Sequence, residues 1–442
     1  MPATAARAAA FAILLRVEQE DAYASELLHS ARAAKLSPAD HSLATELVMG
    51  VQRWRSMLDR KLASVSSQRL DELDAEVLTA LRLGVYQLDF LSRIPPRAAI
   101  YESVELTKAA RKRSAAAFVN AVLRKIDTKS APAAEIDRAT DAKNLSESAA
   151  HPEWLVTRWI ERYGLEVARK ICVYDQAIPE TSIYVDDTVE EELRQAGIRL
   201  EAGQILAQAR RLRSGDVQKA RSAREGRIAI QDEASQLVAL LVGHGQTILD
   251  CCAAPGSKTA LIARRNPRSR VMAVELYPHR SRLMQKLAWQ RNIQIVAADA
   301  RQLPFAIEFE RILADVPCSG TGTLARNPEI KWRLTLPDLS DLQSRQIAIL
   351  NSALNRLVSG GRLVYSTCSL EREENEAVVE AVLQGTTDFT LVDVRSELEE
   401  LQRTGELAWP DFDSLVAGPY LRTIPGVHPG DGFFAAIMER KG

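Results

Sequence analysis

TILDCCAAPGSKT, residues 247–259, is the stretch that decides the fold of the C-terminal half of the chain. Its first four residues have β-strand character and end at Asp250, and a helical composition begins after Gly256. Small residues between a strand and a helix let the backbone approach a ligand closely, and the helix N-terminus offers N–H groups to it. The stretch therefore predicts the ligand-binding turn of an α/β domain.

Short apolar runs separated by helical stretches follow this turn. They are not alternating in polarity, which indicates strands buried on both faces of a mostly parallel sheet. The runs are residues 271–274, 293–297, 312–315, 363–366 and 432–437. We predict a doubly wound, Rossmann-like α/β domain over residues 227–442, with ligands at the carboxyl ends of its strands.

The N-terminal region differs in composition. Residues 1–130 are rich in Ala, Leu, Arg and Glu with apolar residues at helical spacing, which predicts an all-α domain whose last long helix spans about 97–126. Residues 127–150 lack periodicity and predict a linker. A small α/β segment follows, so that residues 131–226 are expected to form a linker and a middle domain. The chain is thus expected to be multidomain.

The charge balance limits the kinds of partner. Lys and Arg number 57 against 58 for Asp and Glu, which excludes a chain that is basic throughout. An RNA-binding surface would have to be a local patch, and the basic residues of 111–113 and 124–125 are the candidate. We give RNA contact and a solvated helix face about equal weight there.

The cysteines and the hydropathy indicate the cellular setting. Five cysteines, an odd number without a CxxC pair, favour free thiols in a reducing cytosol, and with only 6 His they argue against a metal site. No run reaches the roughly 18 apolar residues that span a bilayer. We expect a cytoplasmic monomer without membrane association.

Two kinds of nucleotide site compete for the turn at 250–259. A phosphate-binding P-loop requires an upstream glycine and a Gly-Lys-Ser/Thr ending, whereas here Ser257 precedes Lys258, and no GxGxxG occurs. A nucleoside cofactor without phosphates fits better. Glu275 ends the second strand, where a ribose-binding carboxylate is expected, and Asp299 ends the third, where it can accept from an adenine amino group.

Two thiols and a carboxylate are predicted at the same sheet edge. The fourth strand leads into Asp315 and Cys318, and the fifth into Cys368, in turns rich in Gly, Ser and Thr. This position favours a chemical role for the two thiols. Such a set suits methylation of cytosine C5, which becomes nucleophilic after a thiolate adds to C6 and N3 takes a proton.

At these residues the sequence resembles the RNA cytosine-C5 methyltransferases of the NOL1/NOP2/Sun family, in particular their bacterial RsmB (Sun/Fmu) branch. The matching motifs of the C-terminal half are residues 250–259, 315–322, 367–369 and 374–376. Residues 94–102 and 118–124 resemble the NusB-like RNA-binding domain of that branch. The sequence departs from the family in four places. Ser257 replaces a usual Gly, Val316 a usual Ala and Glu275 a commoner Asp, and the Arg-x-Asn signature of the middle domain is not evident around residues 183–186.

The resemblance implies roles for individual residues. The Thr-Cys thiol, Cys368, would attack C6, and the Pro-Cys thiol, Cys318, would assist release, although DNA methyltransferases use the Pro-Cys thiol for attack. Asp315 would support N3. An S-adenosylmethionine site would be formed by Cys252, Ala253, Ala254, Pro255, Gly256, Ser257, Lys258, Glu275, Asp299 and Asp315.

The implied activity is 5-methylcytosine formation in 16S ribosomal RNA, at the cytosine known as position 967. A methyltransferase of another rRNA or tRNA cytosine is an alternative. A non-catalytic RNA-binding or antitermination factor is another, and the two thiols at the cofactor edge count against it.

Overall fold

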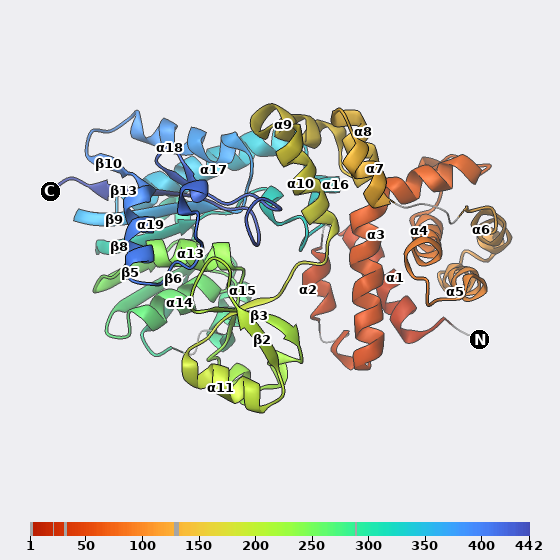
Figure 1. Ribbon diagram of the computed structural model, residues 1–442, viewed down its shortest axis with the longest axis horizontal. Coiled ribbons are helices and arrows are strands. Elements are labelled where there is room, and N and C mark those ends of the chain that lie inside the picture. The colour runs from red at the N-terminus through yellow and green to blue at the C-terminus, as the bar shows by residue number, and fades with distance from the viewer. Residues whose placement is uncertain (1–2, 21, 31–32, 128–131, 288–289) are drawn as a thin grey trace. The chain divides into compact units, whose positions relative to one another are not determined.

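The computed structural model describes residues 3–20, 22–30, 33–127, 132–287 and 290–442 (Figure 1). The chain divides into two compact units. Unit 1 comprises Met1–Ile178 and Leu324–Arg333, and unit 2 comprises Pro179–Thr323 and Leu334–Gly442. The domain boundary expected at 130/131 lies outside the described residues, and residues 132–178 belong with the helical unit rather than with the small sheet.

Unit 1 is built of helices, as the composition predicts. Its apolar core combines α1, α3, α4 and α6, and Leu47, Leu58, Leu62, Leu81 and Leu83 are fully buried in it. The helices are α1 Ala5–Gln19, α2 Ala24–Leu28, α3 Pro38–Val65, α4 Ala75–Phe90, α5 Pro96–Ala109, α6 Ala116–Leu123, α7 Pro132–Arg138, α8 Ala142–Ala149, α9 Glu153–Tyr163, α10 Leu165–Gln176 and α16 Ile330–Arg333.

Two helical predictions for this unit are wrong. The single long helix expected over 97–126 is two helices, α5 and α6, because Arg111 adopts a left-handed φ of 64° between them. Arg is not a residue that signals such a break. The stretch 127–150, expected to be a plain linker, contains α7 and α8. Helix α8 begins where the Asp141 side chain accepts a hydrogen bond from the Asn144 N–H at 2.8 Å.

A segment from the second half of the sequence completes unit 1. This segment, Leu324–Arg333, ends in the short helix α16. The Trp332 Nε1–H donates to the carbonyl of Gln52 at 2.7 Å, and the Lys331 ammonium donates to the carbonyl of Arg53 at 2.9 Å. Nothing in the sequence predicted this packing, because the segment carries no periodicity that points to the N-terminal helices.

Unit 2 begins with the small antiparallel sheet, in the strand order β2-β3-β1-β4. Its core combines the strands with α11, through Ile183, Val189 and Leu193. The elements are β1 Ser182–Tyr184, α11 Asp187–Gln195, β2 Arg199–Ala202, β3 Ala209–Ser214, α12 Arg221–Arg224 and β4 Ala229–Ile230.

The large sheet of unit 2 has the strand order β11-β12-β13-β9-β8-β5-β6-β7, with β10 beside β13. Strands β5 to β9 are parallel to one another, and β13 runs antiparallel to β9. The strands are β5 Thr247–Asp250, β6 Arg270–Glu275, β7 Ile293–Ala297, β8 Phe309–Asp315, β9 Leu357–Thr367, β10 Phe389–Val392, β11 Val416–Ala417, β12 Tyr420–Arg422 and β13 Phe434–Arg440.

Helices cover both faces of this sheet, which confirms the doubly wound prediction. Helices α13, α14 and α19 cover one face and α17 and α18 the other (Figure 1). The side chains of the first group pack with Ile248 and Leu313, and those of the second pack with Leu249 and Ile312. Adjacent strand residues thus point to opposite cores. The helices are α13 Glu233–Leu241, α14 Ser257–Arg265, α15 Pro278–Leu287, α17 Leu336–Leu354, α18 Glu376–Leu383 and α19 Val394–Arg403.

Candidate active site

The carboxyl ends of β5, β6, β8 and β9 meet at one edge of the sheet. The strand order reverses at β5, which has β6 on one side and β8 on the other. In open α/β sheets such a switch point is where ligands bind. The turn at 250–259 leaves β5 at this point, and Gly256, with a φ of 110°, caps the N-terminus of α14. The positive φ requires Gly there, and the first N–H groups of α14 have no partner within the helix.

Asp250, the last residue of β5, is a buried carboxyl group at the start of this turn. The Thr259 hydroxyl donates to its Oδ2 at 2.7 Å, while its Oδ1 is buried and accepts no hydrogen bond from the described residues. Burial raises the pKa of Asp250 to about 7. Sequence reasoning gave this residue no individual role, although it stands in the motif. Its unpartnered oxygen is an acceptor for a ligand.

Glu275 and Asp299 differ in how available their carboxylates are. Glu275 is 7% exposed, and its Oε1 accepts the Tyr277 N–H at 2.9 Å, which leaves Oε2 for a ribose hydroxyl. Asp299 forms an ion pair with Arg301 at 2.6 Å, and this hydrogen-bonded partner lowers the pKa of Asp299. An adenine amino group would therefore share the Asp299 carboxylate with Arg301.

Lys258 and Asp315 link the cofactor turn to the end of β8. The Lys258 ammonium lies 2.8 Å from Asp315 Oδ2 and 5.0 Å from the centre of the Phe433 ring. Burial lowers the pKa of Lys258, but the charge of Asp315 and the hydrogen bond to it outweigh burial and raise it overall. The Ser366 hydroxyl donates to Asp315 Oδ1 at 2.7 Å. Asp315 is thus held as an acceptor at the sheet edge.

The two thiols that the sequence singled out lie side by side. Asp315 pairs with Ser366 in the parallel register of β8 and β9, so the loops that follow leave the sheet together. Cys318 Sγ lies 3.3 Å from Cys368 Sγ, and the Cys368 N–H donates to Cys318 Sγ, also at 3.3 Å. Both thiols are half-buried, and so is Cys252, whereas Cys172 and Cys251 are buried.

The arrangement makes the two thiols unequal. The hydrogen bond with Cys368 is the largest cause that raises the pKa of Cys318, followed by burial and by the charges of Cys368 and Glu374. Either sulfur can donate in the contact between them, whereas the Cys368 N–H donates to Cys318 Sγ alone. The thiolate is the nucleophilic form of cysteine, so a pair of neighbouring thiols at the sheet edge is suited to covalent chemistry on a ligand bound there.

Comparisons with known proteins agree with this site. A family model described as 16S rRNA methyltransferase RsmB/F matches residues 237–439, and the NusB family model matches residues 4–128. The chain is 34% identical over 459 residues to a probable ribosomal RNA small subunit methyltransferase B of Bacillus subtilis, with all of both proteins covered. It is 32% identical to a ribosomal RNA small subunit methyltransferase B of Escherichia coli, with 92% of each covered.

The chain belongs to the RsmB/F family of 16S rRNA methyltransferases. It is therefore an S-adenosylmethionine-dependent RNA methyltransferase with a NusB-like helical domain at its N-terminus. This outcome confirms the family, fold class and cofactor that the motifs implied.

Solved structures share the fold of this RsmB/F chain. The crystal structure of the protein PH0851 matches 99% of both chains with a TM-score of 0.81 at 21% identity. A methyltransferase homolog from Pyrococcus horikoshii covers 67% of this chain and 97% of its own, with a TM-score of 0.55 at 23% identity.

The basic residues expected to bind RNA are mostly exposed. Arg111 and Arg113 lie in the turn between α5 and α6, and Arg124 and Lys125 follow α6. Lys112 is engaged with Asp74 at 3.0 Å. Four of the five cations are thus available to solvent in the NusB-like domain of this RsmB/F chain.

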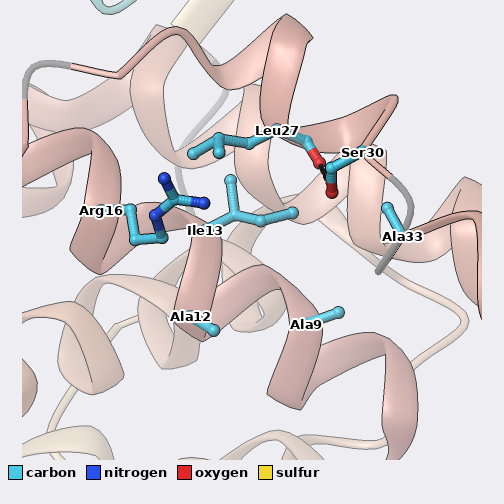
Figure 2. A pocket seen from close by; sticks show the side chains of 7 residues that line it. All are labelled: Ala9, Ala12, Ile13, Arg16, Leu27, Ser30 and Ala33. Carbon is cyan, nitrogen blue, oxygen red and sulfur yellow. Dashed lines mark hydrogen bonds between the residues drawn. The ribbon is translucent and has the colours of Figure 1, made fainter.

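Other possible sites in the chain lack the expected chemistry. A small open pocket of about 70 Å³ in unit 1 is lined by residues of α1 and by Leu27, Ser30 and Ala33, and Figure 2 shows Ile13, Arg16 and Leu27 around it. None of the predicted site residues lines it. In the described part of the chain there is no cluster of His, Cys, Asp and Glu suited to a metal ion, and no helix there is long and apolar enough to span a bilayer.

Proposed function

We propose that this methyltransferase modifies C5 of a cytosine in 16S ribosomal RNA, at the position known as 967, through a covalent bond between Cys368 and C6. The observation that carries the proposal is the pair of thiols 3.3 Å apart at the ends of β8 and β9, beside the Lys258–Asp315 ion pair. The printed names of the Bacillus and Escherichia relatives, ribosomal RNA small subunit methyltransferase B, support the RNA and the subunit.

The first step forms a carbon–sulfur bond. Cys368 attacks C6 as the thiolate, and the ring N3 takes up, by way of water, the proton that the thiol has lost, which makes C5 nucleophilic. Asp315 accepts hydrogen bonds from Lys258 and Ser366, and a carboxylate in this position can accept a further one from N3–H of the adduct. The role of Asp315 is thus to stabilise the protonated N3 of the adduct.

Cys318 acts after the methyl group has been transferred. Once Cys368 is bonded to C6 it carries no negative charge, so one of the causes that raise the pKa of Cys318 is absent in the adduct. Cys318 can then give up its own proton and accept the proton of C5. The C5–C6 double bond re-forms, the C6–S bond breaks, and its electron pair returns to Cys368.

The cofactor site would be formed by the turn at 252–258 with Glu275, Asp299 and Asp315. When bound, S-adenosylmethionine supplies an electrophilic methyl group. The residues present fit it, because Asp250 Oδ1 and Glu275 Oε2 are acceptors without partners among the described residues, and Gly256 keeps the start of α14 free of a side chain. Such a donor–acceptor set suits the ammonium and hydroxyl groups of a nucleoside cofactor better than a triphosphate.

The NusB-like domain would bring the RNA. The substrate RNA is a polyanion, and unit 1 offers exposed cations that suit phosphate contacts. They are Arg111, Arg113, Arg124 and Lys125. Because ribosomal RNA is made and modified in the cytoplasm, we place the protein there.

Two measurements test this function. Bisulfite sequencing of 16S rRNA from a strain lacking the gene should show the loss of one methylated cytosine, at position 967. If the methyl group is lost from another rRNA or from a tRNA, the target assignment is wrong, and if no methyl group is lost, the RNA-binding alternative gains.

The second measurement assigns the two thiols. After incubation with substrate RNA and S-adenosylmethionine, Cys318→Ala should accumulate a protein–RNA complex that survives denaturing electrophoresis, since attack is intact and release is not. Cys368→Ala should form no such complex. Trapping by Cys368→Ala instead would reverse the two roles.

A further inference from the structure

Glu374 is a fully buried carboxylate that the mechanism above does not use. It ends the short helical turn Arg372–Glu374 after the Cys368 loop, and its side chain is 0% exposed. Sequence comparison marks residues 374–376 only as a motif. The carboxylate has no part in cofactor or base binding as proposed above.

The carboxylate of Glu374 is hydrogen-bonded to both thiol loops. Its Oε1 accepts the Ser319 N–H at 2.7 Å, and its Oε2 accepts the hydroxyls of Ser319 and Ser369. Ser319 directly follows Cys318, and Ser369 directly follows Cys368. One side chain thus joins the neighbours of the two reactive residues.

The position of Glu374 is itself fixed. The Gln346 amide donates to Glu374 Oε1 at 2.9 Å and to the Pro317 carbonyl at 3.0 Å, so α17 supports both the carboxylate and the loop before Cys318. The Tyr365 hydroxyl donates to the Glu374 carbonyl at 2.6 Å. In the described chain no Lys or Arg forms an ion pair with Glu374, so neutral donors alone hold this buried group.

We propose that Glu374 is a positioning residue that holds Cys318 and Cys368 side by side, and that it thereby couples attack on the base to release of the product. This inference rests on the proposed covalent mechanism. Attack needs Cys368 alone, whereas release needs Cys318 beside the C6–S bond. Removal of the Glu374 hydrogen bonds separates the loops and slows release more than attack.

The distance between the thiols can be tested without RNA. Phenylarsine oxide condenses with two neighbouring thiols, so that two As–S bonds form and the arsenic-bound oxygen leaves with both thiol protons as water. In the wild-type protein we expect a bridge between Cys318 and Cys368, identified by mass spectrometry of the linked peptides. Glu374→Ala should lower the rate of bridging at least about tenfold, and Glu374→Gln, which retains an acceptor for the Ser319 N–H, should restore most of it.

Glu233→Gln is the matched control. Glu233 is an equally buried carboxylate of unit 2, and it accepts the backbone N–H groups of Gln204, Ile205 and Leu206 far along the sequence from either thiol. This variant should bridge its thiols like the wild type. If Glu374→Ala fails to fold, the double variant Ser319→Ala, Ser369→Ala removes the two Oε2 hydrogen bonds and should slow bridging in the same way.

The RNA measurement completes the test. With substrate RNA, Glu374→Ala should show a lowered kcat at unchanged KM for RNA and should accumulate the covalent complex, whereas Glu233→Gln should not. The positioning role is overturned if a folded Glu374→Ala protein bridges its thiols at the wild-type rate, whatever the RNA mechanism. If Glu374→Ala does not fold, the same outcome in the double variant Ser319→Ala, Ser369→Ala overturns it. Slow bridging in a chain whose Cys318→Ala variant traps no RNA would instead refute the covalent mechanism and leave the positioning role standing.

Discussion

Replacing Asp250 by Asn should stabilise the ligand-free protein at neutral and alkaline pH. Burial raises the pKa of Asp250 from 3.8 to about 7, so the folded state holds a proton that the unfolded chain releases. The stabilisation from this proton is present below pH 3.8 and is lost as the pH rises toward 7. Asn is neutral at every pH and keeps an oxygen for the Thr259 hydroxyl, so Asp250→Asn removes the cost of the buried charge.

The size of the effect follows from the shift. A shift of about three pKa units corresponds to about 4 kcal/mol at most, and the advantage of the variant should grow by about 1.4 kcal/mol for each pH unit between 5 and 7. Above pH 7 it should stay constant. Urea unfolding of wild type and variant at pH 5, 6, 7 and 8 measures the difference, in which most other titrating groups cancel. Asp388→Asn, at an exposed carboxylate of the same unit, is the control and should give no such trend.

The same substitution should weaken ligand binding. Asp250 Oδ1 is the buried acceptor without a partner among the described residues, so exchange of the carboxylate for an amide should lower the affinity for S-adenosylhomocysteine about tenfold or more by calorimetry. If Asp250→Asn gives no stability gain at pH 8 and no rise between pH 5 and 7, the carboxyl group is not buried as described, and the reasoning fails.

Four other predictions concern the rest of the chain. Burial lowers the pKa of Lys331 from 10.5 to about 7, so the free energy of unfolding of the wild type should rise with pH above 7. Lys331→Met should remove up to about 2.7 kcal/mol of this rise between pH 7 and 9, as measured by urea unfolding. A Cβ at Gly322 would lie 2.2 Å from the carbonyl oxygen of Gly432, so Gly322→Ala should displace the thiol loops and lower kcat with a loss of about 1–3 kcal/mol in stability. Charge reversal of the four exposed cations of the NusB-like domain should lower RNA affinity. It should also reduce the slope of log affinity against log salt concentration by about one for each phosphate that is no longer neutralised. An unchanged slope in a binding titration would mean that these cations form a solvated face. Removal of residues 1–130 should leave S-adenosylhomocysteine affinity intact in calorimetry, since every proposed cofactor residue lies in unit 2, while methylation of RNA should fall.

Much of the C-terminal fold could be predicted because buried parallel strands are recognisable in one dimension. The first strand was predicted at 247–250 and is β5 with these bounds, and the run at 293–297 is β7. Apolar runs bounded by turn residues carry this information locally. The break at Arg111 could not be predicted, because the left-handed backbone occurs at an arginine and not at a glycine, the residue that signals such a conformation in a sequence.

The site was predictable to the extent that strand ends locate it. Parallel strands bring their carboxyl ends to one edge, so the order of Asp315, Cys318 and Cys368 along the chain was enough to predict that they share it. Their separation depends on the register of β8 against β9, which no local pattern reports. The pairing of Asp299 with Arg301 and the hydrogen bonds of Glu374 likewise depend on side-chain directions that spacing does not give.

The segment Leu324–Arg333 belongs to unit 1, but it lies in the sequence between two parts of unit 2. The loop that carries Cys318 continues directly into it, and α17, which carries Gln346, follows it. Within unit 1 the segment is held by the Lys331 and Trp332 hydrogen bonds to carbonyls of α3. Both ends of the segment return to unit 2, so the fold of unit 1 requires a piece of chain that lies between the Cys318 loop and α17 in the sequence, and no pattern local to either unit could reveal this.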